Sequence, residues 1–146
     1  MKRFAAVLLL AGCSGAPSAA PAPSPKGEPD RIVVQHVLIS FGGAGTKATR
    51  TKAEAEALAT ALLDRARKGE DFDALVKQYS DDSGSGTYAM ANFDAPPGGP
   101  AGEHLRSRMV AAFGNVGFKL EVGGVGLAPF SPRESPYGWH LIKRLK

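Results

Sequence analysis

The apolar residues of this chain are most concentrated at residues 31–40, which read Arg-Ile-Val-Val-Gln-His-Val-Leu-Ile-Ser. Six of these ten residues are Ile, Val or Leu, the types that favour a pleated and packed surface. They fall at both odd and even positions, a pattern typical of an internal strand that is covered on both faces. The alternation places His36 on the face that also carries Val34 and Leu38.

The last segment of the chain, residues 137–145, repeats this arrangement. It reads Tyr-Gly-Trp-His-Leu-Ile-Lys-Arg-Leu and predicts a second strand, with His140 beside Ile142 on one face. Two strands at opposite ends of the predicted domain therefore each carry one half-buried histidine. A lone histidine on an apolar strand is more often a core residue than a catalytic one, so the pattern alone does not establish a function.

Three segments between these strands have helical periodicity. A capping box formed by Thr51 and Glu54 predicts the start of a helix over residues 52–68. Asp71 is expected to cap a second helix, whose apolar residues recur at helical spacing up to Tyr79. Residues 103–115 carry a third apolar stripe and are predicted to form a helix.

The remaining segments are predicted to be extended or irregular. Residues 87–93 and 125–130 favour short strands, and residues 95–102 form a loop rich in proline and glycine. Long helical segments between few strands favour an α+β fold, in which a small and mostly antiparallel sheet is covered by helices.

The N-terminal residues differ from the rest in composition. Residues 1–12 combine Lys2 and Arg3 with a short apolar run, which is typical of a secretory signal and shorter than the roughly 20 residues that span a bilayer. The run ends in Leu-Ala-Gly-Cys13, which resembles the lipobox of bacterial lipoproteins. In that family the cysteine is lipidated and becomes the new N-terminus. An unused thiol in a flexible region is the alternative interpretation of Cys13.

Two consequences follow for the organisation of the chain. Cys13 is the only cysteine, so no intrachain disulfide is possible. Residues 13–30 are rich in Pro, Ala and Ser and are predicted to be a disordered tether, which leaves residues 31–146 as one domain. The formal charge is +4, and without Lys2 and Arg3 the chain has 16 basic and 14 acidic residues. This balance gives no argument for nucleic-acid binding.

Five segments occur in an order and at spacings that carry a family resemblance. No single one of them is specific, but together they make the chain similar to the parvulin-type peptidyl-prolyl isomerases, in particular those of the bacterial cell envelope. The segments are residues 35–39, 69–82, 109–118, 121–123 and 135–143.

The resemblance implies a four-stranded antiparallel sheet covered by about four helices, with a shallow cleft that binds proline and no cofactor. It also implies roles for individual residues. His36 and His140 match a pair of core histidines, Asp82 matches the residue that faces the reacting amide, and Ser135 lies beside the histidine pair. The residues that match the apolar, substrate-binding wall are Met90, Met109, Phe113 and Phe118.

The leading hypothesis is therefore a prolyl cis/trans isomerase that assists the folding of exported proteins, lipid-anchored through Cys13 to a bacterial cell membrane. In a host with two membranes it would lie at the outer membrane or face the periplasm. The alternative is a non-catalytic binding module for extended client segments. This alternative is kept because residues 88–93 depart from the Gly-Asp-Leu-Gly segment of many relatives. No group of residues has the spacing of a metal site.

Pattern alone also supports simpler interpretations of three of these residues. Met109 and Phe113 lie one turn apart and could be core residues, and Asp82 could be a turn-capping carboxylate.

A basic loop after the first strand contains Lys47, Arg50 and Lys52. Some parvulins recognise phosphate before proline with an arginine-rich loop at this place. Phosphate recognition usually gathers several Arg donors, whereas this loop has one Arg and two scattered Lys. We therefore expect no preference for phosphorylated substrates, and a preference for neutral or apolar residues before proline.

Overall fold

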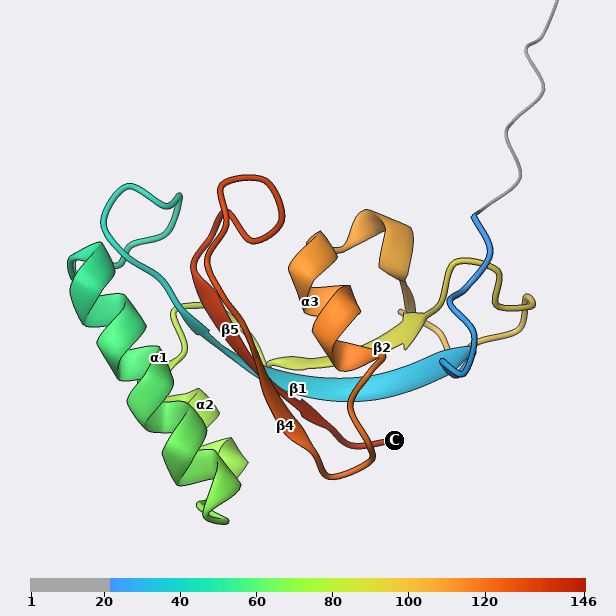
Figure 1. Cartoon of the computed structure of the whole chain (residues 1–146), viewed down its shortest axis with the longest axis horizontal. Coiled ribbons are helices and arrows are strands. Elements are labelled where there is room, and N and C mark those ends of the chain that lie inside the picture. The colour runs from blue at the N-terminus through green and yellow to red at the C-terminus, as the bar shows by residue number, and fades with distance from the viewer. Residues whose placement is uncertain (1–21) are drawn as a thin grey trace, which may run out of the picture.

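The computed structural model describes residues 22–146, which fold around a five-stranded sheet of order β3-β2-β1-β5-β4 (Figure 1). All neighbouring strands are antiparallel except β2 and β3, which are parallel. The strands are β1 (Arg31–Ile39), β2 (Thr87–Ala91), β3 (His104–Leu105), β4 (Val125–Ala128) and β5 (Trp139–Arg144). The predicted leader and Cys13 lie outside the described residues.

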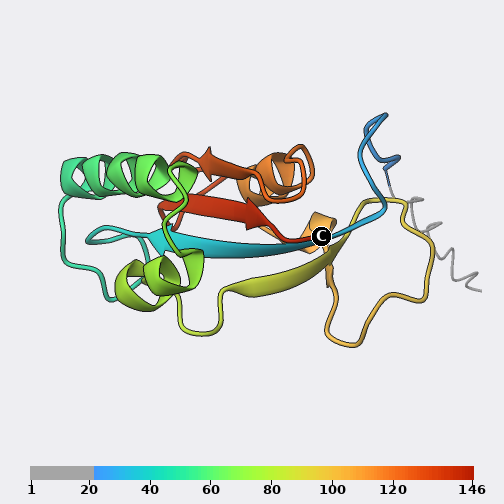
Figure 2. The same cartoon turned by 90° about the horizontal axis from the view of Figure 1, so that it is seen from below.

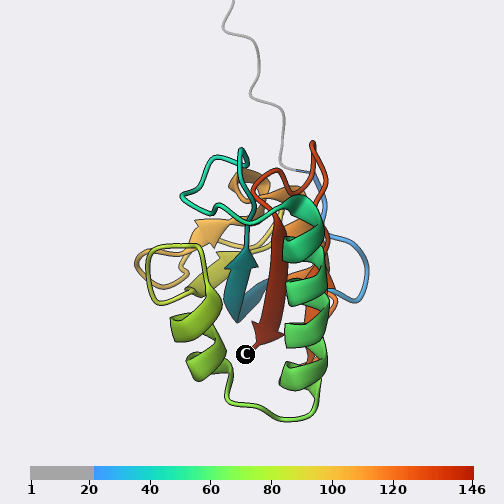
Figure 3. The same cartoon turned by 90° about the vertical axis from the view of Figure 1, so that its left-hand side faces the viewer.

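The predicted internal strand is confirmed, because β1 lies between β2 and β5 and is covered on both faces. Val37 and Ile39 pack in a core beneath α1 (Lys52–Arg67) and α2 (Phe72–Tyr79). Ile32 and Val34 pack on the opposite face, beneath α3 (Ala111–Gly117). Figure 1 shows helices on both sides of the sheet, and Figure 3 shows α1 and α2 side by side in front of β1 and β5.

The first two predicted helices are also confirmed. The backbone N–H of Glu54 donates to the Thr51 hydroxyl at 3.2 Å, and the backbone N–H of Thr51 donates to the Glu54 carboxylate at 2.7 Å. This reciprocal capping box starts α1 one residue after Thr51, as the sequence predicts. Asp71 caps α2 by accepting a hydrogen bond from the backbone N–H of Asp73.

The predicted helix over residues 103–115 is wrong in its first half. His104 and Leu105 form β3, residues Arg106–Arg108 form one 3₁₀ turn, and α3 begins only at Ala111. The extended backbone of Met109 and Val110 separates these two pieces. His104 and Leu105 pair in parallel with Met90 and Ala91 at the end of β2. This pairing adds a fifth strand to the four antiparallel strands that were expected.

Residues at the end of the predicted tether pack against the domain. The backbone N–H of Asn92 donates to the Asp30 carbonyl at 2.8 Å, and the Glu28 carboxylate forms a buried ion pair with Arg106. Figure 2 shows the connection between β2 and β3 leaving the sheet at the end where this N-terminal segment also lies. The folded unit thus includes residues before Arg31. Within residues 22–146, no helix is long and apolar enough to span a bilayer.

Candidate functional site

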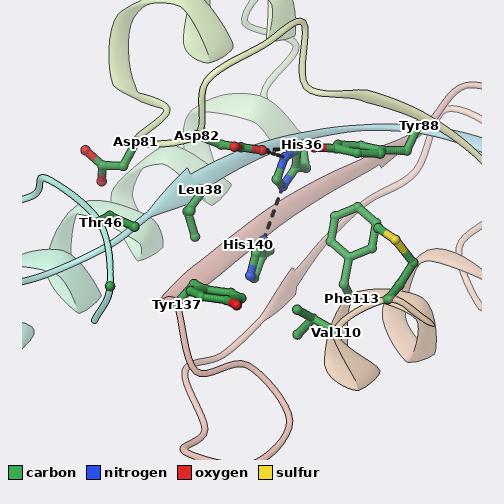
Figure 4. Close-up of a pocket in the computed structure, with 12 residues that line it drawn as sticks. His36, Leu38, Thr46, Asp81, Asp82, Tyr88, Val110, Phe113, Tyr137 and His140 are labelled. Atoms are coloured by element: carbon green, nitrogen blue, oxygen red, sulfur yellow. Dashed lines mark hydrogen bonds and ion pairs between the residues drawn. The ribbon is translucent and has the colours of Figure 1, made fainter. Parts of the chain in front are cut away.

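A pocket with a volume of about 310 Å³ opens on the α3 side of the sheet (Figure 4). Its residues come from β1, β2 and β5, from the loops that follow β1 and α2, from the turn before β5, and from α3 with the residues just before it. Polar side chains line one part of it and apolar side chains another. The lining residues are His36, Leu38, Gly45, Thr46, Asp81, Asp82, Tyr88, Met109, Val110, Phe113, Tyr137 and His140.

The two predicted histidines meet at this pocket. In the register of β1 and β5, Leu38 lies opposite His140 and His36 lies opposite Ile142, so the histidines are diagonal neighbours on one face. Their Nδ1 atoms are 3.2 Å apart, and the two rings are inclined by only 13°. The Nε2 atom of His36 lies 3.0 Å from Oδ2 of Asp82, which brings the three predicted polar residues into one chain (Figure 4).

Burial keeps both histidines neutral at neutral pH. Burial and the neighbouring His36 together lower the pKa of His140 to about 3, with Asp82 opposing part of this effect. Burial also lowers the pKa of His36, although the hydrogen bond and the charge of Asp82 partly oppose this effect. The site is therefore a pair of neutral imidazoles beside a carboxylate.

The carboxylate of Asp82 fixes the hydrogen-bond direction, since a carboxylate only accepts. His36 then donates through Nε2–H and accepts through Nδ1 from Nδ1–H of His140. The Nε2 atom of His140 is left without a proton, and this buried atom has no hydrogen-bond partner among the described residues. In Figure 4 this nitrogen points away from His36, toward Tyr137 and Val110.

The loop that carries Asp82 is fastened to β1 by its neighbour Asp81. The backbone N–H of Asp81 donates to the Leu38 carbonyl at 2.8 Å, and its carboxylate accepts from the backbone N–H of Ser40 at 2.8 Å. Arg50 donates to the same carboxylate and to the Ser40 carbonyl. These bonds hold Asp82 at a fixed position against the edge of the pocket.

The apolar wall consists of Met109, Val110 and Phe113, as predicted for two of these residues. The Phe113 ring meets both histidine rings edge-on, at centroid distances of 5.1 Å to His36 and 5.5 Å to His140. Phe113 is only 2% exposed and belongs to the core, whereas Met109 is half-buried. Phe113 therefore contributes to both the core and the wall.

Three predicted site residues lie elsewhere. Met90 and Phe118 are buried in the core beneath α3 and do not line the pocket. Met90 lies opposite Ile32 in the register of β2 and β1, farther along the strand than the pocket residues His36 and Leu38. Ser135 is buried, but its hydroxyl donates to the Gly138 carbonyl at 2.7 Å, so it does not make the expected contact with the histidines.

The sequence interpretation missed Tyr88, although a signal was present. In β2, Tyr88 and Met90 lie on the same face of the strand. The register places Tyr88 opposite Val34 and Met90 opposite Ile32, so Tyr88 is the nearer of the two to His36. The pocket position predicted for Met90 is thus taken by Tyr88. Leu38, Thr46, Val110 and Tyr137 were also missed; of these, Leu38 was recognised only as a neighbour of His36 on β1.

The basic loop does not bring its cations to the pocket. Arg50 is paired with Asp81, and the ammonium of Lys52 lies 4.4 Å from the centre of the Phe130 ring. Asp81 and Asp82 line the pocket, and among the described residues no Lys or Arg side chain does. Within residues 22–146, no three His, Cys, Asp or Glu side chains are grouped so that they could hold a metal ion.

Two curated proteins illustrate the sequence relationship. Chaperone SurA of Chromohalobacter salexigens is 36% identical over 122 residues, which are 81% of this chain and 24% of that protein. Foldase protein PrsA of a Geobacillus species is 42% identical over 76 residues, which are 52% of this chain and 23% of that protein. The chain thus spans about a quarter of the length of these relatives.

Solved structures show the same fold. The solution structure of the TbPIN1 superposes with a TM-score of 0.60 at 19% identity, covering 80% of this chain and 98% of that one. The crystal structure of a PpiC-type peptidyl-prolyl cis-trans isomerase domain gives a TM-score of 0.52 at 16% identity, covering 80% and 89%. The sequence of residues 23–146 matches the family described as the PPIC-type PPIASE domain, and the chain belongs to that family.

Proposed function

We propose that this protein is a peptidyl-prolyl cis/trans isomerase that acts on proline-containing segments of exported, incompletely folded chains. The observation that carries the proposal is one pocket in which an apolar wall faces a carboxylate with a neutral histidine pair behind it. The proposal is also supported by membership of the PPIC-type PPIASE domain family and by the relatives named chaperone and foldase.

A catalyst of prolyl isomerisation has to lower the rotational barrier without changing the equilibrium between the cis and trans forms. Rotation about the bond before proline faces a barrier of about 18–20 kcal/mol, because resonance gives that bond partial double-bond character. The cis and trans forms differ by only about 0.5–1 kcal/mol. The catalyst therefore has to stabilise the twisted amide, in which resonance is lost and negative charge moves from the oxygen to the nitrogen.

The pocket offers one group of residues for each requirement. Met109, Val110 and Phe113 form a dry wall that would hold the proline ring while the preceding carbonyl rotates. Asp82, held by His36, would shape the electric field at that carbonyl from the opposite side. No covalent bond is broken, so neither a nucleophile nor a cofactor is needed.

Isomerisation of a proline-containing tetrapeptide by the purified protein tests the proposal. We expect faster cis-to-trans conversion with the wild-type protein and slower conversion with Asp82→Ala. Asp73→Ala is the matched control, because Asp73 lies on α2 and binds the Gln35 side chain outside the pocket. A wild-type protein that assists refolding of a client without accelerating isomerisation would instead show a non-catalytic binding module. The 36% identity to a protein named chaperone is the reason to test for a non-catalytic binding module.

We further propose that the protein is exported and held at a membrane by a lipid on Cys13. The support is the sequence of residues 1–13, in which a basic and apolar leader precedes Leu-Ala-Gly-Cys. Cys13→Ser should leave the protein outside the detergent phase after phase separation, while isomerase activity is retained. Equal detergent partitioning of the wild-type and Cys13→Ser proteins would rule the lipid out.

A further inference from the structure

Tyr88 is a pocket residue to which the proposed mechanism gives no role. Its hydroxyl lies 3.0 Å from Oδ2 of Asp82, the same oxygen that lies 3.0 Å from Nε2 of His36. Its ring meets the His36 ring edge-on at a centroid distance of 5.2 Å and the Phe113 ring at 5.9 Å. Figure 4 shows Asp82, His36 and Tyr88 in a row along the edge of the pocket.

The direction of both contacts with Asp82 follows from the protonation of the partners. Partial burial and the neighbouring Asp82 raise the pKa of Tyr88 above its usual value of 10, so the phenol keeps its proton near neutral pH. It therefore donates to the carboxylate, as does the Nε2–H of the neutral His36. Within residues 22–146, Oδ1 of Asp82 has no hydrogen-bond partner, so both protein donors converge on Oδ2.

We propose that Tyr88 is a positioning residue of the isomerase site, whose hydroxyl clamps Oδ2 of Asp82 together with His36 and leaves Oδ1 for the substrate. The carboxylate is attached to a loop and its side chain is 32% exposed, so a single donor would allow it to rotate. Two donors from two different strands fix the position of Oδ2. This inference rests on the proposed isomerase function.

A double-mutant cycle separates this role from simple packing. Tyr88→Phe removes the hydroxyl and keeps the ring against His36 and Phe113. We expect kcat for the tetrapeptide to fall roughly threefold to tenfold with little change in KM, since Asp82 loses one of the two charge-assisted hydrogen bonds that position it toward the reacting amide. In the Asp82→Ala background, the same substitution should change kcat by less than about twofold, because the group that Tyr88 positions is gone.

Tyr79→Phe is the matched control. The Tyr79 hydroxyl binds Arg65 on the opposite side of the sheet, and its removal should leave kcat unchanged. An equal fall in kcat with and without Asp82 would show that the Tyr88 hydroxyl acts independently of this carboxylate, which would overturn the proposal. So would an unchanged kcat in Tyr88→Phe, or loss of the fold in this variant, which would assign the hydroxyl to stability.

The contact can also be tested without the reaction. The same cycle measured on the free energy of unfolding should show that the effects of Tyr88→Phe and Asp82→Ala are not additive. Additive effects would mean that the hydroxyl and the carboxylate do not interact. An inactive wild-type protein that still shows this coupling would overturn the proposed function while leaving the contact established.

Discussion

Two clusters of polar side chains are buried on the α3 side of the sheet, and they differ in how the cost of burying polar groups is avoided. The first is the pocket cluster of Asp82, His36 and His140, which opens to solvent at Asp82. The second, which we call the Arg106 cluster, is closed. Here the guanidinium of Arg106 donates to Glu28, to Asn92 at 2.8 Å and to Asn115 at 3.0 Å.

The difference lies in whether the buried groups are charged. A buried charge is costly unless it is paired and hydrogen-bonded. The histidines of the pocket cluster avoid this cost because they remain neutral. The Arg106 cluster instead pairs a full positive charge with Glu28 and stacks the guanidinium against the rings of Phe93 and Phe118, at 4.6 Å each. Charge is thus buried where segments of the chain are joined, and avoided where a pocket must stay open.

The largest expected effect comes from breaking the ion pair of the Arg106 cluster. Arg106→Met keeps apolar packing against Phe93 and Phe118 but leaves the Glu28 carboxylate buried without its partner. We expect the free energy of unfolding to fall by about 3–5 kcal/mol, measured by denaturant titration. Adding Glu28→Gln to this variant should recover part of the loss.

The matched control for this prediction is an ion pair that is less buried. Arg31 pairs with Glu103 at 3.0 Å, and the Arg31 side chain is 31% exposed. Arg31→Met should cost at most about 1 kcal/mol, as is usual for exposed pairs. Similar losses in Arg31→Met and Arg106→Met would show that burial does not distinguish the two pairs.

A second test concerns the wall that faces the pocket cluster. The sequence placed Met109 and Phe113 in the substrate-binding wall, and the burial of Phe113 shows that it also belongs to the core. Phe113→Ala should reduce stability by about 3–5 kcal/mol as well as activity, because it leaves a cavity in the core.

Met109→Ala is the sharper variant, because Met109 is half-buried at the pocket. It should lower kcat/KM with a loss of stability below about 2 kcal/mol, measured by thermal unfolding and by the tetrapeptide assay. Unchanged activity per folded molecule in both variants would remove Met109 and Phe113 from the substrate-binding wall.

The neutral state of the pocket cluster predicts a pH dependence of stability. The pKa of His140 is about 3 in the folded protein and 6.5 when unperturbed, so the unfolded chain binds more protons between these values. Stability should therefore fall as the pH drops below about 6.5, by about 2 kcal/mol from His140 between pH 7 and pH 5. The lowered pKa of His36 acts in the same direction.

Two variants check the assignment to this histidine. His140→Asn should flatten the dependence of unfolding free energy on pH between 7 and 5. His104→Asn should not, because His104 is exposed. If His140→Asn kept the slope of the wild-type protein, the histidine pair would have to carry charge in the folded state.

The two clusters also differ in how far the sequence could predict them. The histidines could be assigned to one face because a strand alternates with period two, and the capping box of Thr51 is local in sequence. The Arg106 cluster joins residues up to 78 positions apart, and the apolar stripe of residues 103–115 suggested an uninterrupted helix instead. Glu28 lies in a proline-rich segment whose composition predicts disorder, so its burial was not foreseen.

The smallest expected effect concerns the charge of the substrate and tests whether the pocket cluster excludes anions. Arg50 is occupied by Asp81 and the Ser40 carbonyl, and Lys52 lies over Phe130. The carboxylate of Asp82 lines the pocket and has no ion pair with Lys or Arg among the described residues. A phosphate before proline would therefore meet negative charge without a convergent set of donors. Matched peptides with Ala, Leu, Glu or phosphoserine before proline should show kcat/KM for phosphoserine no higher than for Ala or Leu. Lys47→Ala is the control and should leave this order unchanged, because Lys47 is exposed and does not line the pocket. A clear preference for phosphoserine that is lost in Lys47→Ala would mean that this loop forms an anion site, and that the pocket admits the charge that we expect it to exclude.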